Sequence, residues 1–139
     1  MLIEWSEELV LGVERMDATH REFVEQLNAL GQAGDTALLA GLDAFIAHTV
    51  EHFDQENRWM ESMEFPPMHC HRDEHEGVLG IMREVRGMVA DGKFELGRVL
   101  VRELAPWFTN HAATMDAMLA AFIRQKGFDT EAASAAGQA

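Results

Sequence analysis

Apolar residues recur every three or four positions along four stretches of the chain, which is the spacing of one face of an α-helix. The stretches run from residue 18 to about 31, from 36 to about 64, from about 69 to 91 and from 96 to 126. Four helices with short connections favour an all-α, up-down-up-down four-helix bundle, and no sheet is needed. Residues 1–16 show no sustained period, so we expect an arm packed across the bundle.

Caps and prolines mark the expected helix ends. Asp17 and Asp35 are suitable N-caps for the first two helices, because a carboxylate accepts bonds from the free N–H groups of a first turn. The Pro66-Pro67 pair ends the second helix. Pro106 lies inside the fourth, where it removes one helical bond, so we expect a bend one turn earlier or a break that restarts at Pro106. The inner stripe of this helix is expected to comprise Leu96, Leu100, Leu104, Trp107, His111, Met118 and Phe122.

Ionisable residues stand within these apolar stripes, where an unpaired charge would be costly to bury. His52 and Glu56 are four apart, so they lie on one helix face and can present two ligand atoms to one point. His71 and His75 on the third helix are also four apart. His111 and Asp116 on the fourth helix are five apart and can flank the same point. The residues expected to point inward are His20, His52, Glu56, His71, His75, His111 and Asp116.

Five imidazoles and two carboxylates form a ligand set that suits iron, zinc, copper or nickel better than calcium or magnesium. The alternative is that they are polar residues satisfied by hydrogen bonds in the core or at the surface. For a single histidine that alternative is the better one. The placement of all seven on inner stripes favours a transition-metal site inside the bundle.

Composition and charge narrow the class of protein. With 139 residues and 47% hydrophobic content, the chain fits one domain with a sizeable core. A formal charge of −13 argues against nucleic acid or an anionic membrane as partner. No apolar run approaches 18 residues and no leader is recognisable, so a cytoplasmic protein is expected. The single Cys70 cannot form an internal disulfide.

Two further histidines compete for a role at the site. His48 is four residues before His52, but a ligand pair made by these two would leave Glu56 a turn away. We therefore expect His48 outside the ligand set. His69 and Cys70 are expected on a solvated face rather than among the ligands.

These motifs together resemble the hemerythrin family, in particular its single-domain bacterial members. The resemblance rests on Trp5…Gly12-Val13…Asp17-Ala18-Thr19-His20, on His52-Phe53-x-x-Glu56 followed by Met60 and Phe65-Pro66, on His71-x-x-x-His75, and on Trp107…Asn110-His111…Met115-Asp116. It covers residues 1 to about 125. The chain departs from the family pattern at Asn57, where a second glutamate is usual, at Phe65 for tyrosine, at Val78 for an aromatic and at Pro106. None of these departures removes a ligand, although Pro106 could shift His111.

The resemblance implies a hemerythrin-like bundle with an N-terminal arm over residues 1–128, and a diiron centre. The tail over 129–139 is expected to be disordered, because its last eight residues are all Ala, Ser, Gly or Gln. One iron would take His71, His75 and His111, and the other His20 and His52. Glu56, Asp116 and a solvent-derived oxo or hydroxo group would bridge them. Five nitrogens, four carboxylate oxygens and one shared solvent oxygen fill eleven of the twelve positions of two octahedra. One position stays open on the two-histidine iron.

The same resemblance implies reversible O2 binding for carriage, storage or delivery, by a binding protein rather than an enzyme. Azide and nitric oxide are expected as further small ligands, and the chain is expected to be a monomer. Trp107 and Phe108 are expected to wall the ligand pocket and exclude water. The alternatives are a diiron oxidase, peroxidase or nitric-oxide-handling enzyme, and an O2-sensing module. Sensing would need a separate partner, because no output domain is expected after the bundle.

Overall fold

The computed structural model describes residues 1–131, and residues 132–139 lie outside that part. The disorder expected for the tail over 129–139 falls mainly there and stays a prediction. Residues 1–131 form helices and no strand. The helices are η1 (Glu7–Leu9), α1 (Glu14–Gln32), α2 (Asp35–Met63), α3 (Met68–Ala90), α4 (Phe94–His111), η2 (Ala112–Asp116) and α5 (Ala117–Lys126).

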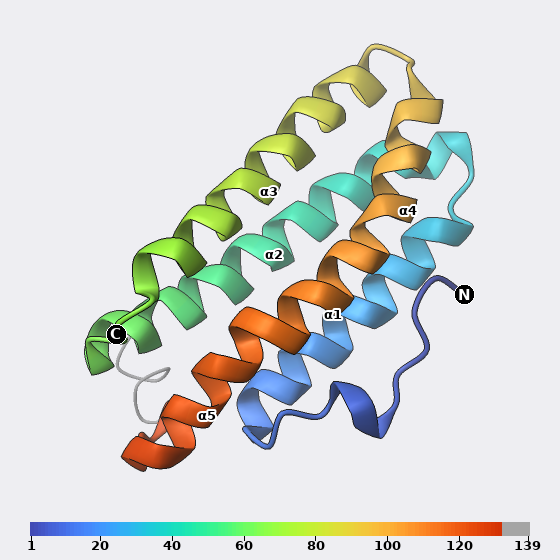
Figure 1. The fold of residues 1–139 in the computed structure, drawn as a ribbon. Helices are drawn as coiled ribbons and strands as arrows, with labels where there is room; N and C mark the ends of the chain where they lie inside the picture. Colours follow the sequence, from blue (N-terminus) through green and yellow to red (C-terminus); the bar gives the residue numbers. More distant parts are fainter. Residues whose placement is uncertain (132–139) are drawn as a thin grey trace.

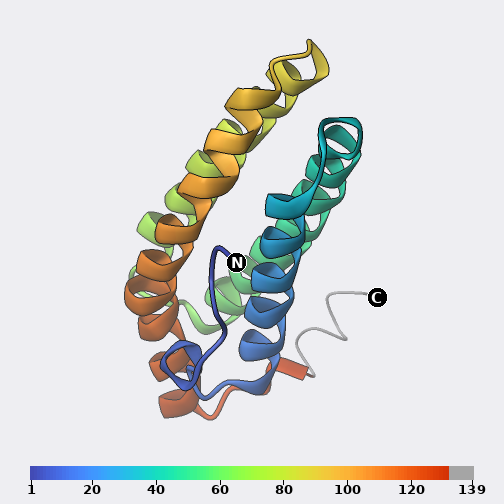
Figure 2. The same ribbon diagram turned by 90° about the vertical axis from the view of Figure 1, so that its right-hand side faces the viewer.

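Four long helical rods lie side by side and form the bundle (Figures 1 and 2). The first three are α1, α2 and α3, and the fourth is the unbroken run α4–η2–α5, which we call the fourth helix. α2 packs against α1 and α3, and α4 packs against α3 and α1. The predicted all-α four-helix bundle is therefore confirmed. In residues 1–131, no helix has the length and apolar content needed to cross a membrane.

The apolar core is divided into two clusters along the bundle. The larger one contains Phe23, Phe45, Val78 and Phe108 among its buried members. The smaller one comprises Val13, Met16, Trp59, Met60, Phe65, Leu119, Ala120 and Ile123. On α1, α2 and the fourth helix, the polar residues predicted to point inward stand between a member of one cluster and a member of the other. On α3 they stand between members of the larger cluster and half-buried Met68, which packs against the smaller one. The two apolar clusters thus enclose a polar layer and separate it from both ends of the bundle.

The N-terminal arm crosses the bundle as predicted and is held by side chains of α1 (Figure 2). Asn28 Oδ1 accepts N–H bonds from Leu2 at 2.8 Å and Ile3 at 3.0 Å, and its Nδ2 donates to the Ile3 carbonyl at 2.8 Å. Asp17 accepts from the backbone N–H groups of Leu11 and Gly12 at 2.8 and 3.1 Å. The prediction that Asp17 caps α1 is wrong, because α1 begins at Glu14 and the carboxylate binds the arm instead.

Pro106 does not break the fourth helix, and the prediction of a break there is wrong. Its side chain and that of Arg102, one turn earlier, are both exposed, so water can reach the carbonyl that proline leaves without a helical partner. The helix is irregular one turn later. At Ala112–Asp116 the backbone widens into a single π-helical turn, which holds one extra residue.

The inner stripe of the fourth helix differs from the predicted one at two positions. Leu96 and Met118 are 42% and 57% exposed. Gly97 faces inward in place of Leu96, and a β-carbon there would come within 2.6 Å of Val89 Cγ2. Past the π-turn the extra residue shifts the register, so that Leu119 and not Met118 is buried.

Candidate metal centre

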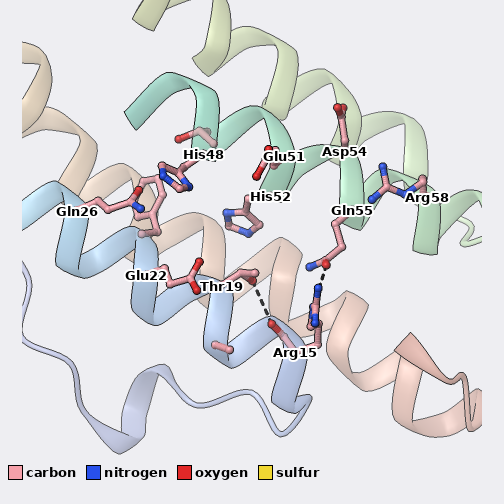
Figure 3. A pocket seen from close by; sticks show the side chains of 13 residues that line it. Arg15, Thr19, Glu22, Gln26, His48, Glu51, His52, Asp54, Gln55 and Arg58 are labelled. Carbon is pink, nitrogen blue, oxygen red and sulfur yellow. Dashed lines mark hydrogen bonds between the residues drawn. The ribbon is translucent and has the colours of Figure 1, made fainter. Parts of the chain in front are cut away.

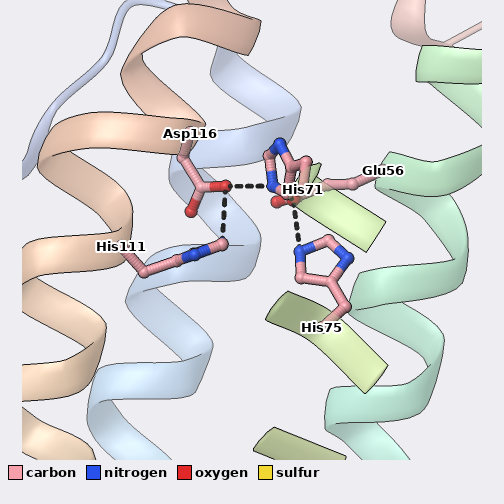
Figure 4. A group of neighbouring side chains, drawn as sticks. All are labelled: Glu56, His71, His75, His111 and Asp116. Carbon is pink, nitrogen blue, oxygen red and sulfur yellow. Dashed lines mark ion pairs between the residues drawn. The ribbon is translucent and has the colours of Figure 1, made fainter. Parts of the chain in front are cut away.

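All seven ionisable residues predicted to point inward are buried in the polar layer. His52 is 8% exposed, and the other six are between 0% and 2% exposed. They come from all four rods, and Figure 4 shows five of them facing one another across the bundle. His48, His69 and Cys70 are exposed and stand outside this group, as expected.

Three histidines gather on one side of the two carboxylates. The Nε2 atoms of His71 and His75 both lie 3.3 Å from Glu56 Oε1. The Nε2 atoms of His71 and His111 lie 3.0 and 3.1 Å from Asp116 Oδ1. We call this group, with the carboxylate oxygens that it faces, the three-histidine half.

The remaining two histidines face the other oxygen of each carboxylate. His52 Nε2 lies 2.8 Å from Glu56 Oε2, and His20 Nε2 lies 3.6 Å from the same atom. His20 Nε2 is also 3.1 Å from Asp116 Oδ2. We call this group the two-histidine half. Glu56 and Asp116 each direct one oxygen to the three-histidine half and the other oxygen to the two-histidine half. A carboxylate that bridges two ions has this arrangement.

Several atoms at the centre have no hydrogen-bond partner, although they are buried. They are the Nε2 atoms of His20, His71, His75 and His111, the Oε1 atom of Glu56 and both carboxylate oxygens of Asp116. Buried polar atoms without partners are rare and costly. A cation between them would accept their lone pairs, and the nitrogen and oxygen donors suit a transition metal. The residues present therefore fit a metal site.

Proton affinities at the centre reflect the same crowding of charge. Burial alone would lower the pKa of His20, but the carboxylates of Asp116 and Glu56, 3.1 and 3.6 Å from its Nε2 atom, outweigh burial and raise the pKa to about 10. The same balance raises the pKa of His71 to about 9. Burial would raise the pKa values of the two carboxyl groups, but the surrounding histidines hold both well below their usual range. Against burial, Asp116 also raises the pKa of His111, whereas burial lowers that of His75. Without metal, protons on His20 and His71 thus make the largest contribution to balancing the two carboxylates.

Two histidines are oriented by side chains outside the centre. His75 Nδ1–H donates to Asn57 Oδ1 at 3.1 Å, and His111 Nδ1–H donates to Glu74 Oε1 at 2.8 Å. With the proton on Nδ1, the Nε2 lone pair of each ring points inward and is available to a metal. Sequence analysis registered Asn57 only as a departure from the family pattern, and it missed Glu74. The sole sequence signal for Glu74 is its place between His71 and His75.

Aromatic rings cover both halves of the centre. Phe53 stacks on His75 with ring centroids 3.9 Å apart, and Trp107 stacks on His111 at 4.8 Å. Phe108 meets His20 edge-on at 5.2 Å. Trp107 and Phe108 were expected to wall the ligand pocket together, but they flank different halves of the centre. Half-buried Trp107 lies at the three-histidine half, and buried Phe108 lies at the two-histidine half.

The π-turn explains how His111 and Asp116 reach one centre from one helix. In an α-helix of 3.6 residues per turn, residues five apart point about 140° away from each other. The extra residue of η2 brings position five nearly back onto the same face. His111 Nε2 and Asp116 Oδ1 accordingly lie 3.1 Å apart.

The fold and the site together define a metal-binding helical bundle with a histidine and carboxylate ligand set. Residues 11–123 match the model of the hemerythrin HHE cation binding domain, and the chain belongs to the hemerythrin family. A bacteriohemerythrin of Ralstonia nicotianae is 49% identical over 97% of this chain and 98% of its own length. One from Methylococcus capsulatus is 24% identical over 72% of this chain and 79% of its own length.

Solved structures agree on the fold. The crystal structure of a wild-type hemerythrin superposes with a TM-score of 0.79 and covers 85% of this chain and 95% of that one. Its sequence identity is 22%, so this likeness concerns the arrangement of helices alone.

Proposed function

We propose that the centre holds two non-haem iron ions, bridged by Glu56, Asp116 and a solvent-derived oxo or hydroxo group, and that it binds O2 reversibly. The observation that carries the proposal is the division of each carboxylate between the two halves. One ion cannot use five imidazoles and four carboxylate oxygens, because an octahedron has six positions. Two ions can use them all.

The chain's own residues would divide the work at such a centre. His71, His75 and His111 would hold one ion and His20 and His52 the other, so the two-histidine half has room for a small ligand. Two ferrous ions supply the two electrons with which O2 is held and released. Phe108 and Phe23, stacked at 4.5 Å, exclude water beside His20. The two carboxylates and a bridging hydroxide would together offset three of the four positive charges of two ferrous ions, which a buried site requires.

Metal content tests the proposal most directly. Protein from iron-replete cells should contain about two irons per chain. Glu56→Ala should lose metal, because it removes a bridge and leaves cationic groups buried without their partner. The matched control is His48→Ala, one turn before His52 and exposed, which should keep both ions. One iron per chain, or zinc alone, would contradict the diiron proposal.

Mixing the ferrous protein with O2 separates a carrier from an enzyme. A carrier should gain a visible absorption band in air and lose it under argon over several cycles without added reductant. A transient band that decays directly to the ferric protein, with release of product, would favour the oxidase, peroxidase or nitric-oxide-handling alternative. Sensing through a separate partner, binding of azide or nitric oxide, a monomeric state and a cytoplasmic location stay predictions.

A further inference from the structure

A polar cleft of about 510 Å³ runs between α1 and α2 and reaches the metal centre at His52 (Figure 3). Four of the residues that line it are buried, namely Phe23, Thr49, His52 and Gln55. Its outer part is formed by long polar side chains of both helices. His52 is also the most exposed of the seven residues of the centre, at 8% against at most 2% for the others.

His52 faces the centre and the cleft at the same time. Its Nε2 atom lies 2.8 Å from Glu56 Oε2, and its ring centroid is 5.2 Å from that of His20. The same imidazole lines the cleft (Figure 3). A molecule in the cleft is therefore separated from the two-histidine half by the thickness of one side chain.

A hydrogen bond joins the two walls of the cleft. Arg15 Nε on α1 donates to Gln55 Oε1 on α2 at 3.1 Å, which ties the helices together at one end (Figure 3). Thr49 directs its hydroxyl to the Phe45 carbonyl at 2.8 Å, so this polar atom is occupied within its own helix.

Two other clefts do not reach the centre. One of about 260 Å³ lies beneath the N-terminal arm and is lined by Ile3, Leu9 and Ala112 among others. Another of about 190 Å³ lies near Leu30 and Arg98. Neither contains any of the seven residues of the centre.

Charge in the α1–α2 cleft is mixed. Arg15 and Arg58 line it together with Glu22, Glu51 and Asp54. The chain as a whole carries −13, which would repel a small anion. Within the cleft the three carboxylates outnumber the two guanidinium groups, and Arg15 is also paired with Glu131 at 3.3 Å, so the charges of the cleft do not favour an anion over a neutral small molecule.

From this geometry we propose that the α1–α2 cleft is the route by which small water-borne ligands reach the two-histidine half, with the His52 ring as its inner barrier. The proposal rests on the proposed function, because it assumes a metal at that half. Beyond the proposed function, this proposal states which face of the bundle admits the ligand and which residues control the rate of ligand association.

Azide binding to the iron-loaded ferric protein, followed by stopped-flow absorption, tests the route. Ala18→Trp and Gln26→Trp each fill the cleft from α1 without touching His52. Each should slow azide association and dissociation by about tenfold and leave the equilibrium constant unchanged, because a blocked route raises only the barrier. Ala47→Trp, exposed on α2 and outside the cleft lining, is the matched control and should change neither rate.

A variant that blocks a different cleft tests the alternative route. Ser6→Trp fills the cleft beneath the arm. Unchanged azide rates in both α1–α2 cleft variants, or slowing by Ser6→Trp instead, would overturn the proposal. If no iron or azide spectrum forms in the parent protein, the proposed function has failed and not the route.

The contribution of charge has its own test. Because azide is an anion, Arg58→Gln should slow its association and Asp54→Asn should speed it, and both effects should shrink at high salt. Equal association rates in the two variants would refute passage of azide past these side chains.

A measurement without iron completes the test. In the metal-free protein, dissolved O2 under pressure serves as a paramagnetic relaxation agent for the imidazole ring protons. Those of His52 should relax more than those of His20 and His71, and Ala18→Trp should abolish the difference. Equal relaxation of the three rings in the parent protein would refute access through this cleft.

Discussion

Removal of the metal should make the stability of the protein strongly dependent on alkaline pH. In the metal-free protein, Glu56 and Asp116 are balanced by protons on His20 and His71, whose pKa values are raised to about 10 and about 9. The ordinary value, which applies to the unfolded chain, is 6.5. The folded state therefore holds two protons that the unfolded state has lost once the pH exceeds about 7.

The sign and size of the effect follow from this difference in bound protons. Folding raises the pKa values of His20 and His71, so the bound protons stabilise the folded state. This stabilisation is complete below pH 6.5 and is lost as the pH rises towards 9 and 10. Each proton contributes about 1.4 kcal/mol per pH unit, which gives a loss of about 2.7 kcal/mol per unit for two. Between pH 7 and 9 the loss of about 5 kcal/mol is comparable to the whole stability of a small domain.

Urea unfolding of the metal-free protein at pH 7, 8 and 9, followed by circular dichroism, measures this slope. Glu56→Gln removes one of the two negative charges and should roughly halve it, whereas His48→Ala should leave it unchanged. Metal-loaded protein should show little slope, because the metal replaces the protons. An unfolding free energy that is flat with pH in the metal-free protein would refute the charge balance proposed for the centre.

Three further outcomes are expected. Glu74→Gln should weaken metal binding by about tenfold or more in a chelator competition, because it removes the charge that orients His111; unchanged affinity would count against that role. Trp107→Ala should speed conversion of the ferrous protein to the ferric form in air, seen by visible absorption, because the ring that covers His111 is lost. Asn28→Ala should cost about 1–3 kcal/mol at the arm and expose residues 1–12 to limited proteolysis, while the metal content stays the same.

Helical periodicity predicted most of the fold and gathered the residues of the centre, and one physical reason accounts for both. A buried ligand must lie on the same face as the apolar residues around it, so His20, His52 and His75 obey the spacing of the core. Helical spacing does not predict the partner of a side chain that binds a segment outside its own helix. Asp17 looks like a cap, but its carboxylate binds the arm.

Contacts between distant helices could not be read from local spacing. Glu74 meets His111 across 37 positions of sequence, and its place between His71 and His75 does not show that it contacts another helix. A bend or a break was expected at Pro106, because proline removes one helical hydrogen bond. The sequence could not show that the carbonyl left without its partner lies where water can reach it. The π-turn was equally hidden, since only the five-residue separation of His111 and Asp116 indicated it.

That turn and the length of its segment depend on each other. With five positions from His111 to Asp116, an ordinary α-helix would point the two side chains about 140° apart, so the π-turn is what keeps them on one face. A chain with one residue fewer here would place the aspartate four positions after the histidine, which an ordinary α-helix already brings to the same face. Leu119, Ala120 and Ile123 would then still face the smaller apolar cluster. We therefore expect natural variants either to keep this number of residues together with the π-turn or to lose one residue and the π-turn together.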